Sequence, residues 1–380
     1  MTVERYTVEH ETRYAYTAPV SQSWQLARQT PRTLPWQRLV SHELQIEPAP
    51  NERRDEFDSF GNTVTHFGLH GAHRLLSVRM RCLVEVAARP AAPLVGGGAG
   101  RGPPSAARGS EPVGPVGGAL ASAVSASAPA DVAATPGARP AAAPVASQRQ
   151  LLAPLPPAAP LAPLEPASQT HEAVPPAPRA GEPTSWESTR EAIRRDTEPP
   201  EHLLAARMSE PTQLVPLSEA ARVYAAASFG RGRLWFDAVH DLMQRIYADF
   251  EFEPGATTVS TSVDEVLYQR SGVCQDFAHL MLACLRGMGL PARYVSGYLL
   301  TEPPPGMPRL MGVDASHAWV AAFSPLHGWV EFDPTNNQLA DQRYITLAWG
   351  ADFADVVPLR GVILGGGDQL MDIEVSVIPT

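Results

Sequence analysis

Three side chains of the kinds used in thiol catalysis, Cys274, His317 and Asp333, lie in the last third of this 380-residue chain. The apolar residues that follow the cysteine recur at helical spacing and predict a helix with one buried face. They are Phe277, Leu280, Met281, Cys284, Leu285 and Met288. Gly272 opens this helix and Gly289 closes it, so Cys274 lies in the first turn. Unpaired N–H groups and the helix dipole stabilise a thiolate there, and no other cysteine is placed to be a nucleophile.

A single cysteine in a helix is more often a small packing residue than a nucleophile, so its partners decide the interpretation. His317 and Asp333 lie in two segments rich in aromatic and β-branched residues, separated by a link of hairpin length. If Phe323 pairs with Trp329 across this link, His317 and Asp333 are diagonal neighbours on one face of the hairpin. A link of the other parity would put them on opposite faces. With the first register, a thiol meets an imidazole backed by a carboxylate, the arrangement used in acyl transfer.

Four motifs of this region resemble the transglutaminase-like superfamily, specifically its bacterial members. They are Gly272-Val273-Cys274-Gln275-Asp276-Phe277-Ala278, Gly289-Leu290-Pro291-Ala292-Arg293-Tyr294-Val295-Ser296-Gly297-Tyr298, His317-Ala318-Trp319-Val320 and Trp329-Val330-Glu331-Phe332-Asp333-Pro334-Thr335. The resemblance implies an α+β fold with a papain-like core, in which the helix that carries the cysteine packs on an antiparallel sheet. It also implies that Cys274 is the nucleophile, His317 the base and Asp333 the residue that orients the base.

Composition divides the chain into three regions. Residues 1–88 contain segments in which apolar and polar residues alternate, which predicts an antiparallel β domain with Cys82 on its buried face. This region resembles the N-terminal region of bacterial transglutaminase-like proteins, including the turn Asp58-Ser59-Phe60-Gly61-Asn62. Residues 89–184 are rich in Ala, Pro, Gly and Ser and contain no aromatic residue, so we expect a disordered insertion. Residues 185–380 are expected to form the catalytic core, with further β-strands at their C-terminal end.

The net charge of −10 argues against nucleic acid or an anionic membrane as the main partner. No apolar run has the length of a signal-peptide core or a membrane span, which favours a cytoplasmic protein. Three cysteines agree with a reducing compartment and no disulfide framework. All 30 basic residues other than histidine are arginine. The expected partner is a protein or peptide substrate, and the sequence predicts no oligomeric state.

Further residues near the motifs are candidates for the substrate cleft. Gln275, beside the nucleophile, is a candidate for stabilising an oxyanion. Trp319 and Trp329 are large enough to line a cleft, although tryptophans on a hairpin also serve as packing residues. His279 points away from the nucleophile on the helix, so we expect a core or surface histidine there. The histidines of residues 1–88 match no zinc spacing and no calcium loop is visible, so no metal or other cofactor is expected.

Three functions remain open from the sequence. Acyl transfer to water would make the protein a cysteine peptidase or amidase, and transfer to an amine would make it a crosslinking transglutaminase. The third is a binding scaffold with a degenerate site, which the presence of all three triad residue types disfavours. Between the two enzymes we expect the hydrolase, because crosslinking inside a cell would be hard to restrain without a regulatory ion site.

Overall fold

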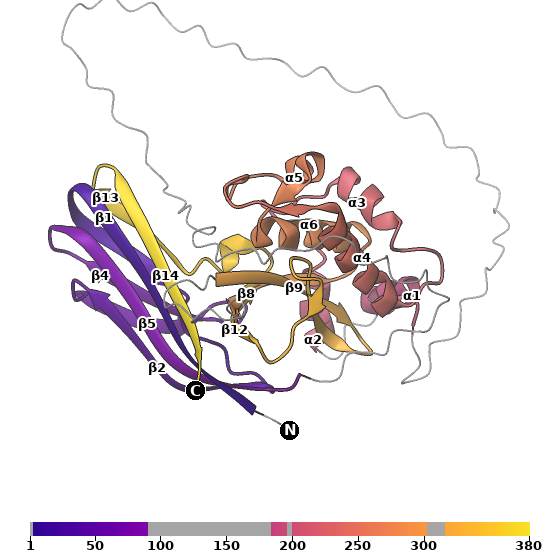
Figure 1. Ribbon diagram of the computed structural model, residues 1–380, viewed down its shortest axis with the longest axis horizontal. Coiled ribbons are helices and arrows are strands. Elements are labelled where there is room, and N and C mark those ends of the chain that lie inside the picture. The colour runs from indigo at the N-terminus through magenta and orange to yellow at the C-terminus, as the bar shows by residue number, and fades with distance from the viewer. Residues whose placement is uncertain (1–2, 90–183, 196–199, 302–315) are drawn as a thin grey trace, which may run out of the picture. The chain divides into compact units, whose positions relative to one another are not determined.

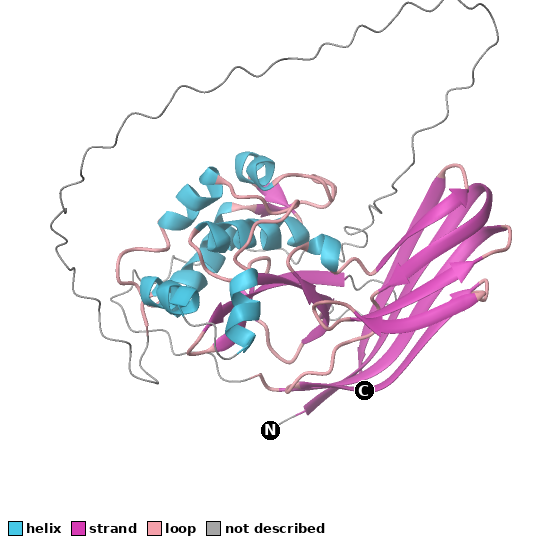
Figure 2. Cartoon of the chain, turned by 180° about the vertical axis from the view of Figure 1, so that it is seen from behind, coloured by secondary structure: helices cyan, strands magenta, loops and turns pink. Residues whose placement is uncertain are grey.

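The computed structural model describes residues 3–89, 184–195, 200–301 and 316–380. The predicted disordered insertion therefore lies almost wholly outside the described residues. The described part contains two large antiparallel sheets, one of seven strands and one of five strands accompanied by helices (Figure 1, Figure 2). The protein is thus an α+β protein, as the sequence predicts.

The larger sheet is built around one long strand, β1. Its strands are β1 (Val3–Ala27), β2 (Gln37–Glu47), β3 (Glu52–Phe57), β4 (Thr63–Leu69), β5 (His73–Ala87), β13 (Leu359–Gly365) and β14 (Gln369–Pro379). Tyr6 of β1 pairs with β5 on one side and with β14 on the other. Ser23 pairs in the same way with β4 and β13. Because β2 pairs with β5 and β3 pairs with β4, β1 lies in the interior of the sheet (Figure 1).

Strand β1 shows the alternation that its sequence predicts. One face is buried and carries Tyr6, Val8, His10, Thr12 and Tyr14. The other face carries charged residues that pair across strands, such as Glu11 with Arg79 at 2.7 Å. Cys82 of β5 lies in the buried core, and burial raises the pKa of its thiol to about 12. This cysteine is therefore a packing residue, because the thiolate and not the thiol is the reactive form.

The C-terminal strands β13 and β14 belong to this sheet, which corrects their expected grouping with the catalytic core in residues 185–380. Val375 and Val377 are buried in the same core as β1 and β5. Their alternation predicts a strand, but it contains no information about the partner of that strand. Residues 1–88 fill only one edge of β1, and the far end of the chain pairs with the other.

The smaller sheet has the strand order β11-β10-β9-β8-β12. Its strands are β8 (Ala292–Leu299), β9 (Ser316–Ser324), β10 (Gly328–Asp333), β11 (Gln338–Leu339) and β12 (Tyr344–Gly350). The helices that accompany it are α1 (Trp186–Arg195), α2 (Pro200–Arg207), α3 (Glu219–Ala226), α4 (Trp235–Asp249), α5 (Val263–Gln269) and α6 (Cys274–Gly287). Two short parallel strands, β6 (Glu251–Phe252) and β7 (Ser271–Gly272), lead into α6, and a 3-10 helix, η1 (Phe353–Asp355), follows β12.

Helix α6 is buried on all sides, whereas its sequence predicts a single buried face. Every residue from Cys274 to Arg286 is buried, because β8 and β9 cover one side and α3, α4 and α5 contact the helix elsewhere. The polar residues on the second face have partners. His279 Nε2 accepts a hydrogen bond from the Phe353 N–H at 3.2 Å, and Arg286 donates to three backbone carbonyls. A helix with this much apolar surface and paired polar groups is stable in the interior of the fold.

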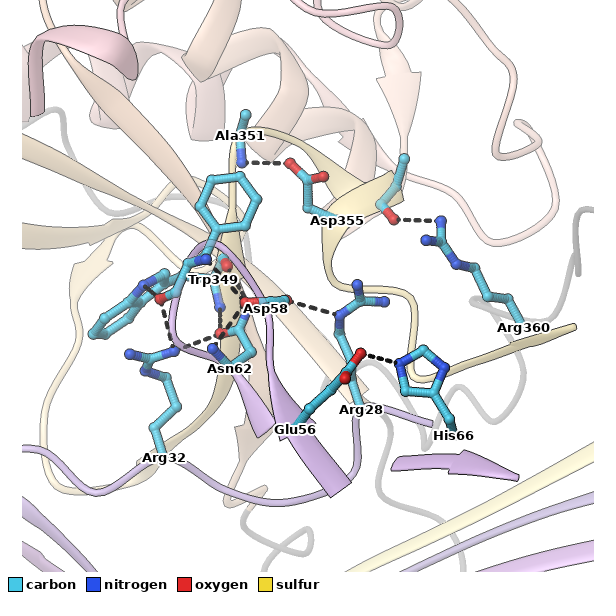
Figure 3. Close-up of polar contacts among 12 residues, drawn as sticks. Arg28, Arg32, Glu56, Asp58, Asn62, His66, Trp349, Ala351, Asp355 and Arg360 are labelled. Carbon is cyan, nitrogen blue, oxygen red and sulfur yellow. Dashed lines mark hydrogen bonds and ion pairs between the residues drawn. The ribbon is translucent and has the colours of Figure 1, made fainter. Parts of the chain in front are cut away.

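Strand β12 contacts the larger sheet through apolar and polar groups. Residues of the smaller sheet that share the core of the larger one are Tyr298, Ile345 and Leu347. In the turn after β3, Asp58 accepts hydrogen bonds from the Phe60 and Asn62 N–H groups. The Asn62 amide then bonds both the N–H and the carbonyl of Trp349, at 3.0 and 2.8 Å (Figure 3). The Asp58–Asn62 turn noted in the sequence thus holds β12, because the Asn62 side chain makes the two hydrogen bonds that a neighbouring strand would make.

Candidate active site

Cys274 is the first residue of α6, as the glycine pattern predicts. Asp276 holds the turn that precedes it, because its Oδ2 accepts hydrogen bonds from the Val273 N–H at 2.8 Å and the Thr257 hydroxyl at 2.6 Å. A side chain at position 272 would approach Asp276 to within 2.8 Å, so this turn requires Gly272. Burial raises the pKa of the Asp276 carboxyl, and these two hydrogen bonds oppose the rise. The sequence around the cysteine therefore fixes where α6 begins.

The hairpin of β9 and β10 has the register that brings His317 and Asp333 together. Phe323 pairs with Trp329, which is the first of the two alternatives left open by the sequence. His317 Nε2 lies 2.7 Å from Asp333 Oδ2, as diagonal neighbours on one face permit. Both side chains are buried, and Asp333 is completely inaccessible. The condition on which the sequence argument depended is therefore met.

Cys274 lies close enough to His317 to contribute to the raised pKa of this histidine, so the imidazole lies between thiol and carboxylate. Because Nε2 contacts Asp333, Nδ1 is the ring nitrogen left for the sulfur. Burial alone would lower the pKa of His317. The charge and hydrogen bond of Asp333, with smaller contributions from Cys274, instead raise this pKa to about 10. The ring is therefore a cation at neutral pH, able to stabilise a thiolate and to donate a proton.

Five donors surround the carboxylate of Asp333. Oδ1 accepts from the N–H groups of Thr335 and Asn336 at 2.9 and 3.2 Å. Oδ2 accepts from His317, from the Tyr344 hydroxyl at 2.7 Å and from Asn336 Nδ2 at 2.7 Å. Burial tends to raise the pKa of Asp333, but the His317 charge and these hydrogen bonds lower it below its usual value. The buried carboxylate is therefore an anion that orients and charges the imidazole.

Tyr344 and Asn336 are parts of this site that the sequence analysis did not single out. Asn336 follows Asp333 by three residues, and a carboxylate that ends a strand commonly accepts hydrogen bonds from the backbone just after it. The order Asp-Pro-Thr-Asn was therefore an available signal. Tyr344 begins β12, which is not adjacent to β10 in the sheet. Its contact with Asp333 becomes apparent only when the strand order is known.

Two of the three cleft candidates lie beside triad residues. Trp319 is fully buried, with its ring centre 6.0 Å from that of His317, and its Nε1 donates to Glu331 Oε2 at 2.7 Å. Gln275 is buried next to the cysteine and directs its amide to the Val259 carbonyl at 3.5 Å. The tryptophan therefore supports the imidazole from inside the fold, and the glutamine amide already has a partner.

Trp329 lies at the other end of β10, four residues from Asp333, which is about 13 Å along a strand. Its ring contacts Phe323 with centres 5.2 Å apart, and the Arg293 guanidinium lies 4.2 Å from its centre. The structure does not bring this candidate to the triad. Its contacts are those of a packing residue on the hairpin.

The other reactive residue types occupy packing positions. Cys284 is fully buried in α6, and burial raises the pKa of its thiol well above the usual value. Burial lowers the pKa of His279 to about 4, so this histidine is neutral and occupies the core, one of the two positions expected for it. In the described ranges, no three or more His, Cys, Asp or Glu side chains come together in a way that could hold a metal ion. Among the same residues, no helix combines the length and apolar character needed to cross a membrane.

Two known protein families match separate parts of the chain. Residues 6–85 match the bacterial transglutaminase-like N-terminal region, and residues 226–334 match the transglutaminase-like superfamily. The second range includes Cys274, His317 and Asp333. Both matches agree with the resemblances seen in the sequence motifs.

Relatives and solved structures extend this result. The uncharacterized protein Rv2569c of Mycobacterium tuberculosis is 35% identical over 380 residues, which cover 99% of this chain and 93% of the relative. A protein-glutamine gamma-glutamyltransferase of Pseudomonas aeruginosa is 39% identical over 110 residues, 27% of this chain and 16% of that protein. A solved structure described as "a Putative Cysteine Protease from Cytophaga hutchinsonii" shares the fold, with a TM-score of 0.60, 15% identity and coverage of 100% of this chain and 91% of that one. The matches support thiol-dependent catalysis in general, and the chain belongs to the transglutaminase-like superfamily, with the N-terminal region of its bacterial members.

Proposed function

We propose that this protein catalyses acyl transfer at amide bonds through Cys274, His317 and Asp333, and that water is its usual acceptor. It would then be a cysteine peptidase or amidase. The observation that carries the proposal is the position of His317, whose Nε2 lies 2.7 Å from Asp333 Oδ2 and whose pKa is raised by Asp333 and by the neighbouring Cys274. A nucleophile, a base and a group that orients the base are thus joined in one chain of contacts.

In the proposed first half-reaction, the Cys274 sulfur attacks the amide carbonyl carbon and the electrons of the C=O bond move to oxygen. The N–H groups at the start of α6 stabilise this oxyanion, because the first turn of a helix has unpaired donors. The His317 imidazolium then donates its proton to the leaving nitrogen. The C–N bond breaks, the amine departs and a thioester of Cys274 remains.

In the second half-reaction, His317 takes a proton from water as the oxygen attacks the thioester carbonyl. The C–S bond breaks, a carboxylic acid leaves and the thiolate–imidazolium pair is restored. Cys274 and His317 each retain a small exposed fraction, 6% and 9%, and we infer that water reaches the thioester there. The preference for water over an amine is an inference from this access and from the sequence.

A transglutaminase is the second candidate, favoured by the similarity to the Pseudomonas protein-glutamine gamma-glutamyltransferase. The chemistry differs only in the acceptor, because a primary amine replaces water at the thioester. The chain contains no lysine, so it cannot crosslink to itself through a lysine side chain. Any amine incorporated into product must therefore come from an added partner.

The test combines casein, a fluorescent primary amine and the purified protein, with Cys274→Ala as the inactive variant and Cys284→Ala as the matched control. We expect peptide cleavage or ammonia release that depends on Cys274 and exceeds amine incorporation. Cys274-dependent amine incorporation that outruns both would replace the hydrolase with the transglutaminase. Selective labelling of Cys284 or Cys82 by iodoacetamide, read by mass spectrometry, would contradict the proposed nucleophile.

A further inference from the structure

A second buried contact on the hairpin repeats the geometry of the His317–Asp333 pair. Trp319 follows His317 by two residues on β9, and Glu331 precedes Asp333 by two residues on β10, so each pair is diagonal on the same face. The Trp319 indole N–H donates to Glu331 Oε2 at 2.7 Å. The Trp319 ring stacks beside His317 with an interplanar angle of 29°. Glu331 thus sets the orientation of the ring that supports the imidazole.

Arg89 reaches this contact from two residues beyond the end of β5, a strand of the larger sheet. Its Nη1 lies 2.9 Å from Glu331 Oε2, and the two side chains are only 10% and 3% exposed. The N–H bonds of Nη1 are not aligned for a hydrogen bond, so this is a charge contact. Nε and Nη2 donate to the carbonyls of Asp341 and Tyr344 at 3.2 and 3.0 Å. The guanidinium also lies over the ring of Trp36, 5.3 Å from its centre.

Arg89 is therefore linked to both members of the histidine–carboxylate pair. One link runs through Glu331 and Trp319 to the face of His317. The other runs through Tyr344, whose backbone accepts from Arg89 and whose hydroxyl donates to Asp333. Neither Asp333 nor His317 contacts Arg89 in these links, so any effect on the reaction is indirect.

We propose that Arg89 is a positioning residue for the reaction, which holds His317 and Asp333 in register by fixing Glu331 and the start of β12. This inference rests on the proposed function of Cys274, His317 and Asp333. The planar guanidinium suits the role, because it holds its charge against a carboxylate while it donates to two carbonyls. A lysine supplies the charge from a single nitrogen and reproduces only part of this set.

The variants that test the inference separate charge, geometry and simple packing. Arg89→Met removes the charge and the donors but keeps an unbranched apolar side chain. Arg89→Lys restores the charge. Trp319→Phe keeps an aromatic ring beside His317 but removes the N–H that bonds Glu331 together with part of the buried indole ring. Arg38→Met is the matched control, because Arg38 pairs with Glu85 of β5 on an exposed surface of the larger sheet.

The assay measures the rate constant for alkylation of Cys274 by iodoacetamide as a function of pH, together with a thermal melt of each variant. We expect Arg89→Met and Trp319→Phe to lower the rate by about 10- to 100-fold, the effect of misplacing a reacting group by up to 1 Å. The alkaline limit of the pH profile should also move down, because His317 then contacts Asp333 less closely. Other titrating groups that face His317 are Cys274 of α6 and Tyr344 of β12.

Arg89→Lys should recover part of the rate, and Arg38→Met should match the wild type. An Arg89→Met protein with the wild-type rate and pH profile overturns the inference, as does one that only melts at a lower temperature. If Arg89→Met does not fold, the test rests on Trp319→Phe. A Trp319→Phe protein with the wild-type alkylation rate and pH profile also overturns the inference. Failure of the wild-type protein to alkylate at Cys274 faster than at Cys284 would instead refute the proposed function itself.

Discussion

Replacement of Asp333 by asparagine is the sharpest test of how the site works. The two backbone N–H groups that bond Oδ1, from Thr335 and Asn336, require an oxygen at that position. The amide oxygen of the new asparagine must occupy that position, which turns its NH2 group toward His317 Nε2. That nitrogen then has to be unprotonated, so its proton moves to Nδ1, the atom that faces the sulfur. The imidazole holds the wrong tautomer to accept a proton.

The size of the effect follows from the charge that is lost. The surroundings of His317 raise its pKa from 6.5 to about 10, and Asp333 is the largest favourable contribution. At about 1.4 kcal/mol for each tenfold change, this rise corresponds to on the order of 5 kcal/mol of preference for the imidazolium. We expect Asp333→Asn to lower the turnover rate by about 10⁴-fold, as a wrong tautomer does in comparable triads. Donors left facing the new NH2 group should cost about 1–3 kcal/mol of stability.

The measurement is the pH dependence of Cys274 alkylation and of amide hydrolysis in the two proteins. The alkaline limit should fall from near pH 10 in the wild type toward the ordinary range of histidine in the variant. Asp249→Asn is the control, because Asp249 also accepts a hydrogen bond from a tyrosine, Tyr224, but on the exposed surface. An Asp333→Asn protein that keeps its turnover within tenfold and its alkaline limit unchanged would refute the assigned role of the carboxylate.

Three further predictions concern the same site and the chain around it. Tyr344→Phe removes one donor from Asp333 and should lower the alkylation rate about tenfold, whereas wild-type rates would exclude the contact from the reaction. The stability that His317 contributes should be complete below pH 6.5 and vanish as pH rises through about 10, measured as the unfolding free energy of wild type minus that of His317→Ala. Removal of most of residues 90–182, which contain no aromatic side chain, should preserve a cooperative melt and Cys274-dependent activity.

Much of the candidate site is predictable because local patterns determine it. The glycines around α6 place Cys274 at the helix start, and the loop parity decides between two hairpin registers. The register that joins His317 to Asp333 also joins Trp319 to Glu331 by the same diagonal relation. That second pair was therefore within reach of the sequence. The sequence does not mark this pair, because a tryptophan and a glutamate on a strand do not by themselves indicate catalysis.

Contacts between segments far apart in the chain could not be predicted from the sequence. Tyr344 reaches Asp333 from a strand that is not its neighbour in the sheet, and β14 completes a sheet that begins with β1. Alternation of apolar and polar side chains indicates that a strand is half buried. It does not identify the neighbouring strand, because the same alternation suits any neighbour. The total burial of α6 has the same origin, because only the packed helices around it cover its second face.

The apparent boundary near residue 88 separates two patterns of sequence, but hydrogen bonds join the two regions. Gln37 bonds the N–H and carbonyl of Thr346, Asn62 does the same at Trp349, and Arg89 bonds the carbonyl of Tyr344. All three partners are on β12, the strand whose first residue donates to Asp333. A buried charge pair such as His317 and Asp333 needs neighbours that hold it in place, because a misplaced partner leaves an uncompensated charge in the interior. Gln37, Asn62 and Arg89 of the N-terminal region supply such neighbours through their hydrogen bonds to β12.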